Sequence, residues 1–107
     1  MKSKDENIVM TGWTTVANKQ DAVDMIQKLL DNGLIACGQI SGPIESYYKW
    51  KGKLTVENEW RVVLKYSKDN QGELSENLQD LHPYEVPQWV SCRLESTAEY
   101  AKWVKQS

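Results

Sequence analysis

The sequence predicts an α+β fold in which strands and helices follow the order β-α-β-β-α-β-α, a split βαβ arrangement with an antiparallel sheet and helices on one face. Two observations predict it. Segments rich in β-branched and aromatic residues alternate with segments whose apolar residues recur at helical spacing. Two of the strand-like segments are long and are separated only by Lys51-Gly52. The 107 residues are one domain's length, so we expect 1–107 to form a single domain.

The first strand and the first helix come from the N-terminal third of the chain. Residues 8–15 are apolar and β-branched, and Asn18 follows as a candidate N-cap. The next apolar residues recur every three or four positions, which places them on one face of a helix: Ala22, Met25, Ile26, Leu29 and Leu30. Asn32-Gly33 then supplies the residues typical of a helix end.

The middle of the chain predicts a long β-hairpin. Residues 34–50 form a strand that must bend or bulge at Gly38, Gly42 and Pro43, and Lys51-Gly52 supplies the turn. The returning strand, residues 53–67, alternates Trp60, Val62, Leu64 and Tyr66 on one face with Arg61, Val63 and Lys65 on the other. A hairpin of this length extends beyond what the chain's own helices can cover, so it needs a partner.

A polar break at residues 69–72 precedes a short second helix, which carries Leu74, Leu78 and Leu81 on one face and ends before His82-Pro83. Residues 89–94 alternate as a fourth strand, and Thr97 caps a last helix with an apolar edge of Tyr100, Trp103 and Val104. This order is that of ferredoxin-like folds, with the first two helices on one sheet face and the other face apolar and open.

Composition excludes several classes of function. The net charge is −2, from 13 basic and 15 acidic residues that are interspersed, so binding to nucleic acid is not expected. Residues 1–7 are polar, with no signal or membrane segment, which predicts a cytoplasmic protein. Cys37 and Cys92 lie in apolar-alternating segments and are expected to be buried free thiols, without a disulfide or a structural zinc site.

Two dense motifs stand out. Residues 82–87, His-Pro-Tyr-Glu-Val-Pro, place an imidazole, a phenol and a carboxylate between two prolines, which fits either a ligand or metal site around His82 or a rigid connector at a helix end. Residues 46–52 interleave aromatic residues with lysines. Such a ladder can stack on bases, but without a basic excess it favours an oligomer contact.

Glu59 and Lys65 share a strand face and could both enter a cleft or both be solvated. The sequence contains no set of nucleophile, histidine and acid, and no phosphate-binding glycine loop. We therefore expect a binding protein and not an enzyme.

Taken together, these residues resemble the CutA divalent-ion tolerance proteins. The matching blocks span most of the chain: Ala36-Cys37 with Pro43, Ser46-x-Tyr48-x-Trp50-x-Gly52-Lys53, Glu59 with Lys65, His82-Pro83-Tyr84-Glu85-Val86-Pro87, and Tyr100 with Trp103. The ordered set is far more specific than any one block.

The resemblance implies a ferredoxin-like subunit in a tight trimer built around the long hairpins, as in PII-like signalling proteins. It also implies a ligand-binding cleft between subunits, lined by residues matching Cys37, Trp50, Glu59, Lys65, His82 and Tyr84. No cofactor is required, but a divalent cation such as copper is implied, with His82 and Glu59 as candidate ligands. Some family members are thought to use a Cys on the first strand and a His pair, and here Thr14 and Leu81 stand at two of those places.

Three functions remain open at this point. The preferred one is a trimeric, cytoplasmic protein that responds to metal ions and binds a small ligand or cation at its clefts. The alternatives are a structural trimer that scaffolds other proteins, and an enzyme that uses His82 as general acid or base while Tyr84 and Lys65 orient the substrate.

Overall fold

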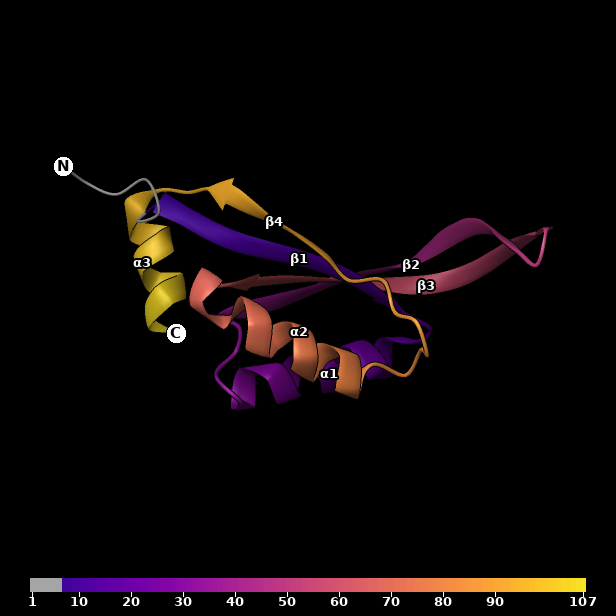
Figure 1. The fold of residues 1–107 in the computed structure, drawn as a ribbon, viewed down its shortest axis with the longest axis horizontal. Helices are drawn as coiled ribbons and strands as arrows, with labels where there is room; N and C mark the ends of the chain where they lie inside the picture. The colour runs from indigo at the N-terminus through magenta and orange to yellow at the C-terminus, as the bar shows by residue number, and fades with distance from the viewer. Residues whose placement is uncertain (1–6) are drawn as a thin grey trace.

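The computed structural model describes residues 7–107 and has three α-helices and four strands in the predicted order (Figure 1). The elements are β1 (Ile8–Val16), α1 (Lys19–Asp31), β2 (Cys37–Trp50), β3 (Lys53–Tyr66), a short 3₁₀ turn (Lys68–Asn70), α2 (Gln71–Leu81), β4 (Val90–Glu95) and α3 (Ala98–Gln106). The prediction that residues 1–7 hold no targeting segment lies, Asn7 apart, outside this part of the chain. No described helix is long and apolar enough to span a membrane.

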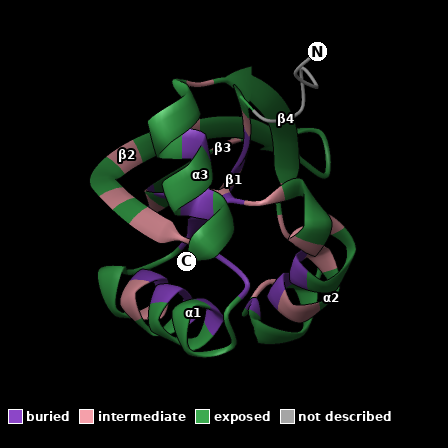
Figure 2. Cartoon of the chain, turned by 90° about the vertical axis from the view of Figure 1, so that its left-hand side faces the viewer, coloured by how far each residue is buried: buried purple, intermediate pink, exposed green. Residues whose placement is uncertain are grey.

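The strands form one antiparallel sheet in the order β2-β3-β1-β4. Helices α1 and α2 lie side by side beneath it (Figure 1). Between them and the sheet is the main core, to which β3 contributes Val62, Leu64 and Tyr66, all fully buried. The alternation that the sequence predicted for β3 is therefore confirmed. Figure 2 shows the same division, with buried residues on the sides of α1 and α2 that face the sheet.

The third helix adds a small second cluster. Val9 packs with Ala101 and Val104 of α3, whereas its neighbour Met10 belongs to the main core. Because consecutive strand residues point to opposite faces, α3 covers one end of the face that α1 and α2 leave open. Among the described residues, no other helix covers that face, although Thr11 and Thr15 on it are buried.

The predicted irregularity of β2 is confirmed. The pairing register of β2 with β3 shifts between Ser41 and Ile44, so that one extra residue of β2 is accommodated at Gly42-Pro43. The turn at Lys51-Gly52 has positive φ at both residues, 51° and 78°, which suits the right-handed twist of a two-residue hairpin. The second strand begins at Cys37 and not at residue 34, because Leu34 and Ile35 turn into the core.

The prediction for the cysteines was half wrong. Both are free thiols, as expected, but Cys92 is exposed and Cys37 is only half-buried. Cys92 lies on β4, an edge strand that is exposed along its whole length. Alternation alone cannot distinguish such an uncovered strand from a buried one.

Candidate functional site

The connector that follows α2 brings His82 against the end of β1. His82 is only 7% exposed. Its Nδ1 accepts a hydrogen bond from the backbone N–H of Tyr84 at 3.1 Å, so the proton of the neutral ring is on Nε2. Nε2 lies 3.0 Å from the Thr15 carbonyl oxygen and 2.9 Å from Thr14 Oγ1. Both ring nitrogens are therefore occupied by hydrogen bonds within the chain.

Next to the imidazole, Tyr84 reaches across to β3. Its hydroxyl donates a hydrogen bond of 2.8 Å to Oε2 of Glu59, a carboxylate that is itself only 8% exposed. The rings of His82 and Tyr84 are tilted against each other with centroids 4.9 Å apart. The structure thus joins three of the six predicted cleft residues, Glu59, His82 and Tyr84, into one cluster.

The cluster shifts the ionisation of its members. Burial raises the pKa of Glu59, but hydrogen bonds from the hydroxyls of Ser46, Tyr84 and Thr15 together outweigh it, so that the net pKa lies below the ordinary value and the carboxyl is ionised at neutral pH. Burial lowers the pKa of His82 in spite of the opposing influence of the Thr15 carbonyl. Burial and the bond to Glu59 raise the pKa of Tyr84 far above its usual value, so the phenol keeps its proton.

These shifts predict how stability depends on pH. The ordinary pKa values of His82 and Glu59 are 6.5 and 4.5, and both values are lower in the folded chain, so the unfolded chain binds more protons below each of them. The stabilisation is complete above these values and is lost as the pH falls. We expect the free energy of unfolding, measured by urea titration, to begin to fall below pH 6.5 and to fall further below pH 4.5.

His82 is the chain's only histidine, so His82→Asn should abolish the first stage of this acid destabilisation. Glu59→Gln should reduce the second, and Val86→Ala, at a fully solvated position of the same connector, should change neither. A first stage of undiminished size in His82→Asn would show that the imidazole is not its source.

The other three predicted residues lie elsewhere. Cys37 and Lys65 are directly paired on β2 and β3, where Cys37 Sγ is 3.8 Å from the Tyr100 hydroxyl and Lys65 Nζ donates to Gln39 Oε1 at 3.4 Å. Trp50 is at the hairpin tip and 62% exposed. At about 3.3 Å per residue, Glu59 is about 20 Å along β3 from either group. One chain therefore does not assemble the predicted six-residue cleft.

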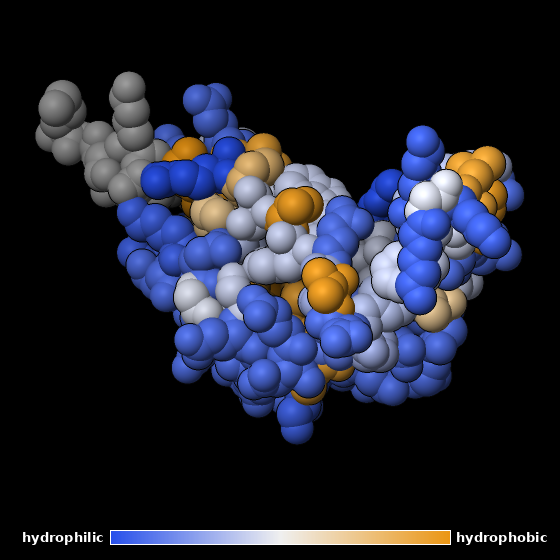
Figure 3. All heavy atoms as spheres, turned by 45° about the vertical axis from the view of Figure 1, so that its right-hand side comes forward, coloured by the Kyte–Doolittle hydropathy of each residue, from blue (hydrophilic) through white to orange (hydrophobic). Residues whose placement is uncertain are grey.

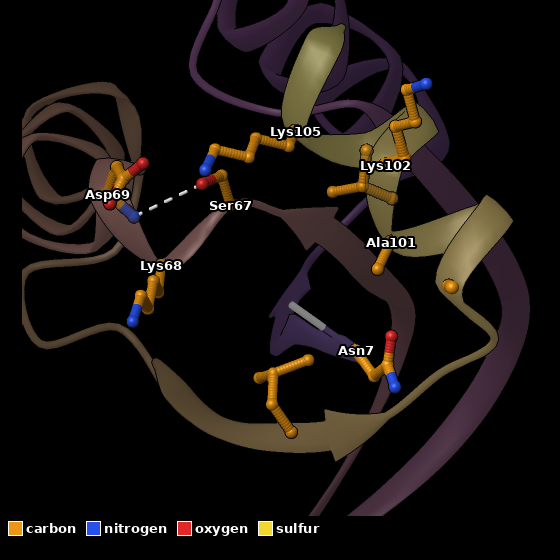
Figure 4. Close-up of a pocket in the computed structure, with 10 residues that line it drawn as sticks. Asn7, Ser67, Lys68, Asp69, Ala101, Lys102 and Lys105 are labelled. Atoms are coloured by element: carbon orange, nitrogen blue, oxygen red, sulfur yellow. Dashed lines mark hydrogen bonds between the residues drawn. The ribbon is translucent and has the colours of Figure 1, made fainter. Parts of the chain in front are cut away.

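Two cavities adjoin these elements. One, of about 340 Å³, borders the Glu59 cluster, and its lining consists of Trp13, Thr14, Thr15, Ile44, Ser46, Arg61, Gln88 and Val90. The other, of about 470 Å³, lies between the end of β3 and α3 and contains none of the predicted residues (Figure 4). Lys105 and Lys102 of α3 stand on its rim (Figure 4).

The described residues do not fit a metal centre on His82. Among residues 7–107, no group of three or more His, Cys, Asp or Glu side chains is placed to hold an ion. Neither ring nitrogen of His82 has a lone pair to offer, because one accepts from Tyr84 and the other carries the proton. The predicted metal role of His82 and Glu59 is thus left without support from the geometry of a single chain, and remains a prediction.

Sequence reasoning did not anticipate the hydroxyl groups of the site. Thr15 and Ser46 help to keep Glu59 ionised, and Thr14 contacts His82. Thr14 was noted only because it replaces a Cys of the resembling family. Its proximity to His82 shows that those two positions do meet in space, although 68 residues separate them. Only the packing of the connector on β1 brings them together.

The fold and the site define a small ferredoxin-like α+β protein with a projecting hairpin and a polar cluster at its base. The family model described as CutA1 divalent ion tolerance protein matches residues 10–107. The chain belongs to this family.

Relatives and solved structures agree with this assignment. The chain is 35% identical over 96 residues to the divalent-cation tolerance protein CutA of Thermotoga maritima, covering 89% of this chain and 94% of the relative. It is 32% identical over 93 residues to the protein of the same name from Pyrococcus horikoshii, covering 86% and 90%. The crystal structure of CutA1 from Oryza sativa superposes with a TM-score of 0.88 at 26% identity, covering 92% of each chain.

Proposed function

We propose that the chain forms a homotrimer that serves divalent-cation tolerance by binding a small ligand or a divalent cation at clefts between subunits, without turnover. The family and the names of the relatives support the role in divalent-cation tolerance. The observation that carries the rest is the exposed hairpin. In this proposal no cofactor is required, copper is one candidate cation, and the location is the cytoplasm, as the sequence predicts.

The hairpin projects far beyond the rest of the chain (Figure 1). β1 pairs with β3 only from Trp60 to Tyr66, so residues 53–59 have β2 as their partner. The molecule is 54 Å long, and its radius of gyration of 15.1 Å exceeds the value of about 13 Å expected for a compact domain of this length. An extended two-stranded ribbon is marginal in water without further packing.

Both faces of this ribbon carry exposed apolar side chains. Tyr47, Leu54 and Val56 lie on one face and are 64%, 72% and 47% exposed, and Trp50, at 62%, lies on the other. Figure 3 shows apolar surface near the tip of the hairpin. A ribbon that is apolar on both sides fits between two neighbours, as it would around a threefold axis.

Such an assembly also accounts for the dispersed cleft residues. Trp50, Glu59 and the pair of Cys37 and Lys65 are separated along one hairpin, so a shared pocket requires residues from different subunits. Glu59 brings an ionised carboxylate to that pocket, and Lys65 an ammonium group. These groups bind charged ligands, whereas a hydrogen-bonded, neutral His82 has no free nitrogen with which to act as a base. Binding is therefore favoured over turnover.

Light scattering tests the assembly, and calorimetry tests the ligand. At low micromolar concentration we expect a particle of three times the 12.3 kDa chain mass that does not dissociate on dilution. Titration with Cu²⁺, Zn²⁺ and nucleotides should release or absorb heat with at least one of them. Glu59→Gln should weaken the binding of that ligand. A single-chain species would refute the trimer and its clefts. A trimer without heat would favour a scaffold.

A further inference from the structure

A buried set of hydrogen bonds belongs to His82, the first residue of the motif that the sequence singled out. It is buried, it is the only histidine of the chain, and its two nitrogens bond to different segments. Nδ1 bonds to Tyr84, two residues ahead, and Nε2 bonds to Thr15 on β1, which is 67 residues away in the sequence. The ring therefore links the connector, residues 82–87, to β1 through two hydrogen bonds, and we call this link the clasp.

We propose that His82 is a positioning residue, a neutral imidazole that fastens the connector to β1 and holds the Tyr84 phenol against the Glu59 carboxylate, and that it does not ligate a divalent cation. The side chain of Thr14, which also contacts the ring, agrees with this role. Thr14 presents a neutral hydroxyl, where a thiolate would suit a soft or borderline metal ion. Any cation at the cleft would bind through Glu59 and not through the ring.

The bond from the Tyr84 N–H fixes both the tautomer and the position of the connector. An N–H that points at Nδ1 leaves no space for a second hydrogen there, so the ring can neither take up a proton nor bind a metal through Nδ1 without releasing Tyr84. Release of Tyr84 would free its hydroxyl from Glu59, which is 2.8 Å away. A metal bound at Nε2 would likewise displace the Thr15 carbonyl, at 3.0 Å. Metal binding at His82 would therefore break the hydrogen bonds that hold Tyr84 and Thr15 in place beside Glu59.

The groups that face the ring are all neutral except Glu59 and, more distantly, Asp21 of α1. Thr14, Thr15 and Tyr84 make the direct contacts. A ring placed mainly among neutral donors and acceptors suits a structural clasp.

The side-chain geometry suggests a matched pair of variants. An Asn side chain accepts a hydrogen bond from the N–H two residues ahead, in an Asx turn, which reproduces the Nδ1 bond to Tyr84. His82→Asn should therefore keep the Tyr84 amide protected from hydrogen exchange, and His82→Phe should lose that protection. Val86→Ala, on the same connector, is the control and should match the unchanged chain. Equal loss of protection in His82→Asn and His82→Phe would overturn the clasp.

The decisive measurement is the ¹⁵N spectrum of the single histidine during titration of the full chain with Zn²⁺, which is diamagnetic. We expect a protonated Nε2 and an unprotonated Nδ1, with both signals unchanged by stoichiometric Zn²⁺. A protonated Nδ1, or a Zn²⁺-dependent shift of either nitrogen, would overturn the inference. The spectrum does not require a fold-disrupting variant.

This inference rests on the proposed function only in assigning the cation to Glu59, and the two can fail separately. Heat in the Zn²⁺ calorimetry together with unchanged ¹⁵N signals of His82 supports both the proposed function and the clasp. Heat with a shifted ring overturns the clasp and leaves cation binding standing. Silent ring nitrogens without heat support the clasp and remove Zn²⁺ from the proposed function. The ¹⁵N spectrum of His82 tests the clasp whether the particle contains one chain or three.

Discussion

Introducing charge into the hairpin, with Leu54→Glu and Val56→Glu combined, is expected to convert the proposed three-chain particle into single chains. The two side chains are 72% and 47% exposed in the isolated chain and share a face with Tyr47. In the proposed trimer this face would be covered, and each carboxylate forced into it without a partner would cost several kcal/mol. With three subunits, the cost is repeated at every copy of the interface. Light scattering at low micromolar concentration measures the result.

The control must carry the same change in charge. Lys28→Glu also lowers the charge of the chain by two, but it lies on the solvated side of α1. It should leave three chains per particle, and both variants should retain the helix content of the unchanged chain by circular dichroism. If the double variant remained a trimer, the apolar hairpin face would not be the assembly surface.

Much of the fold could be predicted from the sequence because its local signals agree with its tertiary packing. The helix capped by Asn18 is an example, since the side chain accepts from the Asp21 N–H as the pattern required. The 3₁₀ turn at Lys68–Asn70 was not predicted, because its polar residues are equally typical of a loop. Trp89 was assigned to the last strand, but it precedes β4 and packs on the core.

The candidate site could be predicted only in part. The connector residues His82 and Tyr84 were identified from their motif. Glu59 was identified from the strand face that it shares with Lys65, where a cleft and a solvated position were both open, and the family resemblance favoured the cleft. Their mutual contacts depend on how α2 ends against β1, which no local pattern encodes. The separation of Trp50 and Lys65 from Glu59 follows from their places along one hairpin, so a sequence can indicate these residues without showing which chain supplies each. In the proposed trimer, their assembly would be a property of the oligomer.

Gly12→Ala is expected to produce the largest loss of stability among single small substitutions in β1. A Cβ at Gly12 would lie 2.1 Å from Cη2 and 2.5 Å from Cζ3 of Trp89. The indole cannot easily move, because Nε1 donates to Ser75 Oγ at 2.9 Å and the ring stacks on Tyr66 with centroids 6.2 Å apart. Overpacking of this kind costs about 3 kcal/mol. Thermal unfolding should show a Tm lower by about 15 °C at equal chain concentration.

Two further variants separate this clash from a general effect of alanine. Gly72→Ala, in α2, places its Cβ in open space and should be neutral or stabilising by about 0.5 kcal/mol. Trp89→Leu removes the obstructing ring, so Gly12→Ala should cost much less in that background, and equal costs in both backgrounds would refute the clash. Because Trp89 anchors the far end of the connector that carries His82 and Tyr84, Gly12→Ala should also expose the Tyr84 amide to exchange. The packing of one indole on a glycine therefore stabilises the core and holds the connector in place against the sheet.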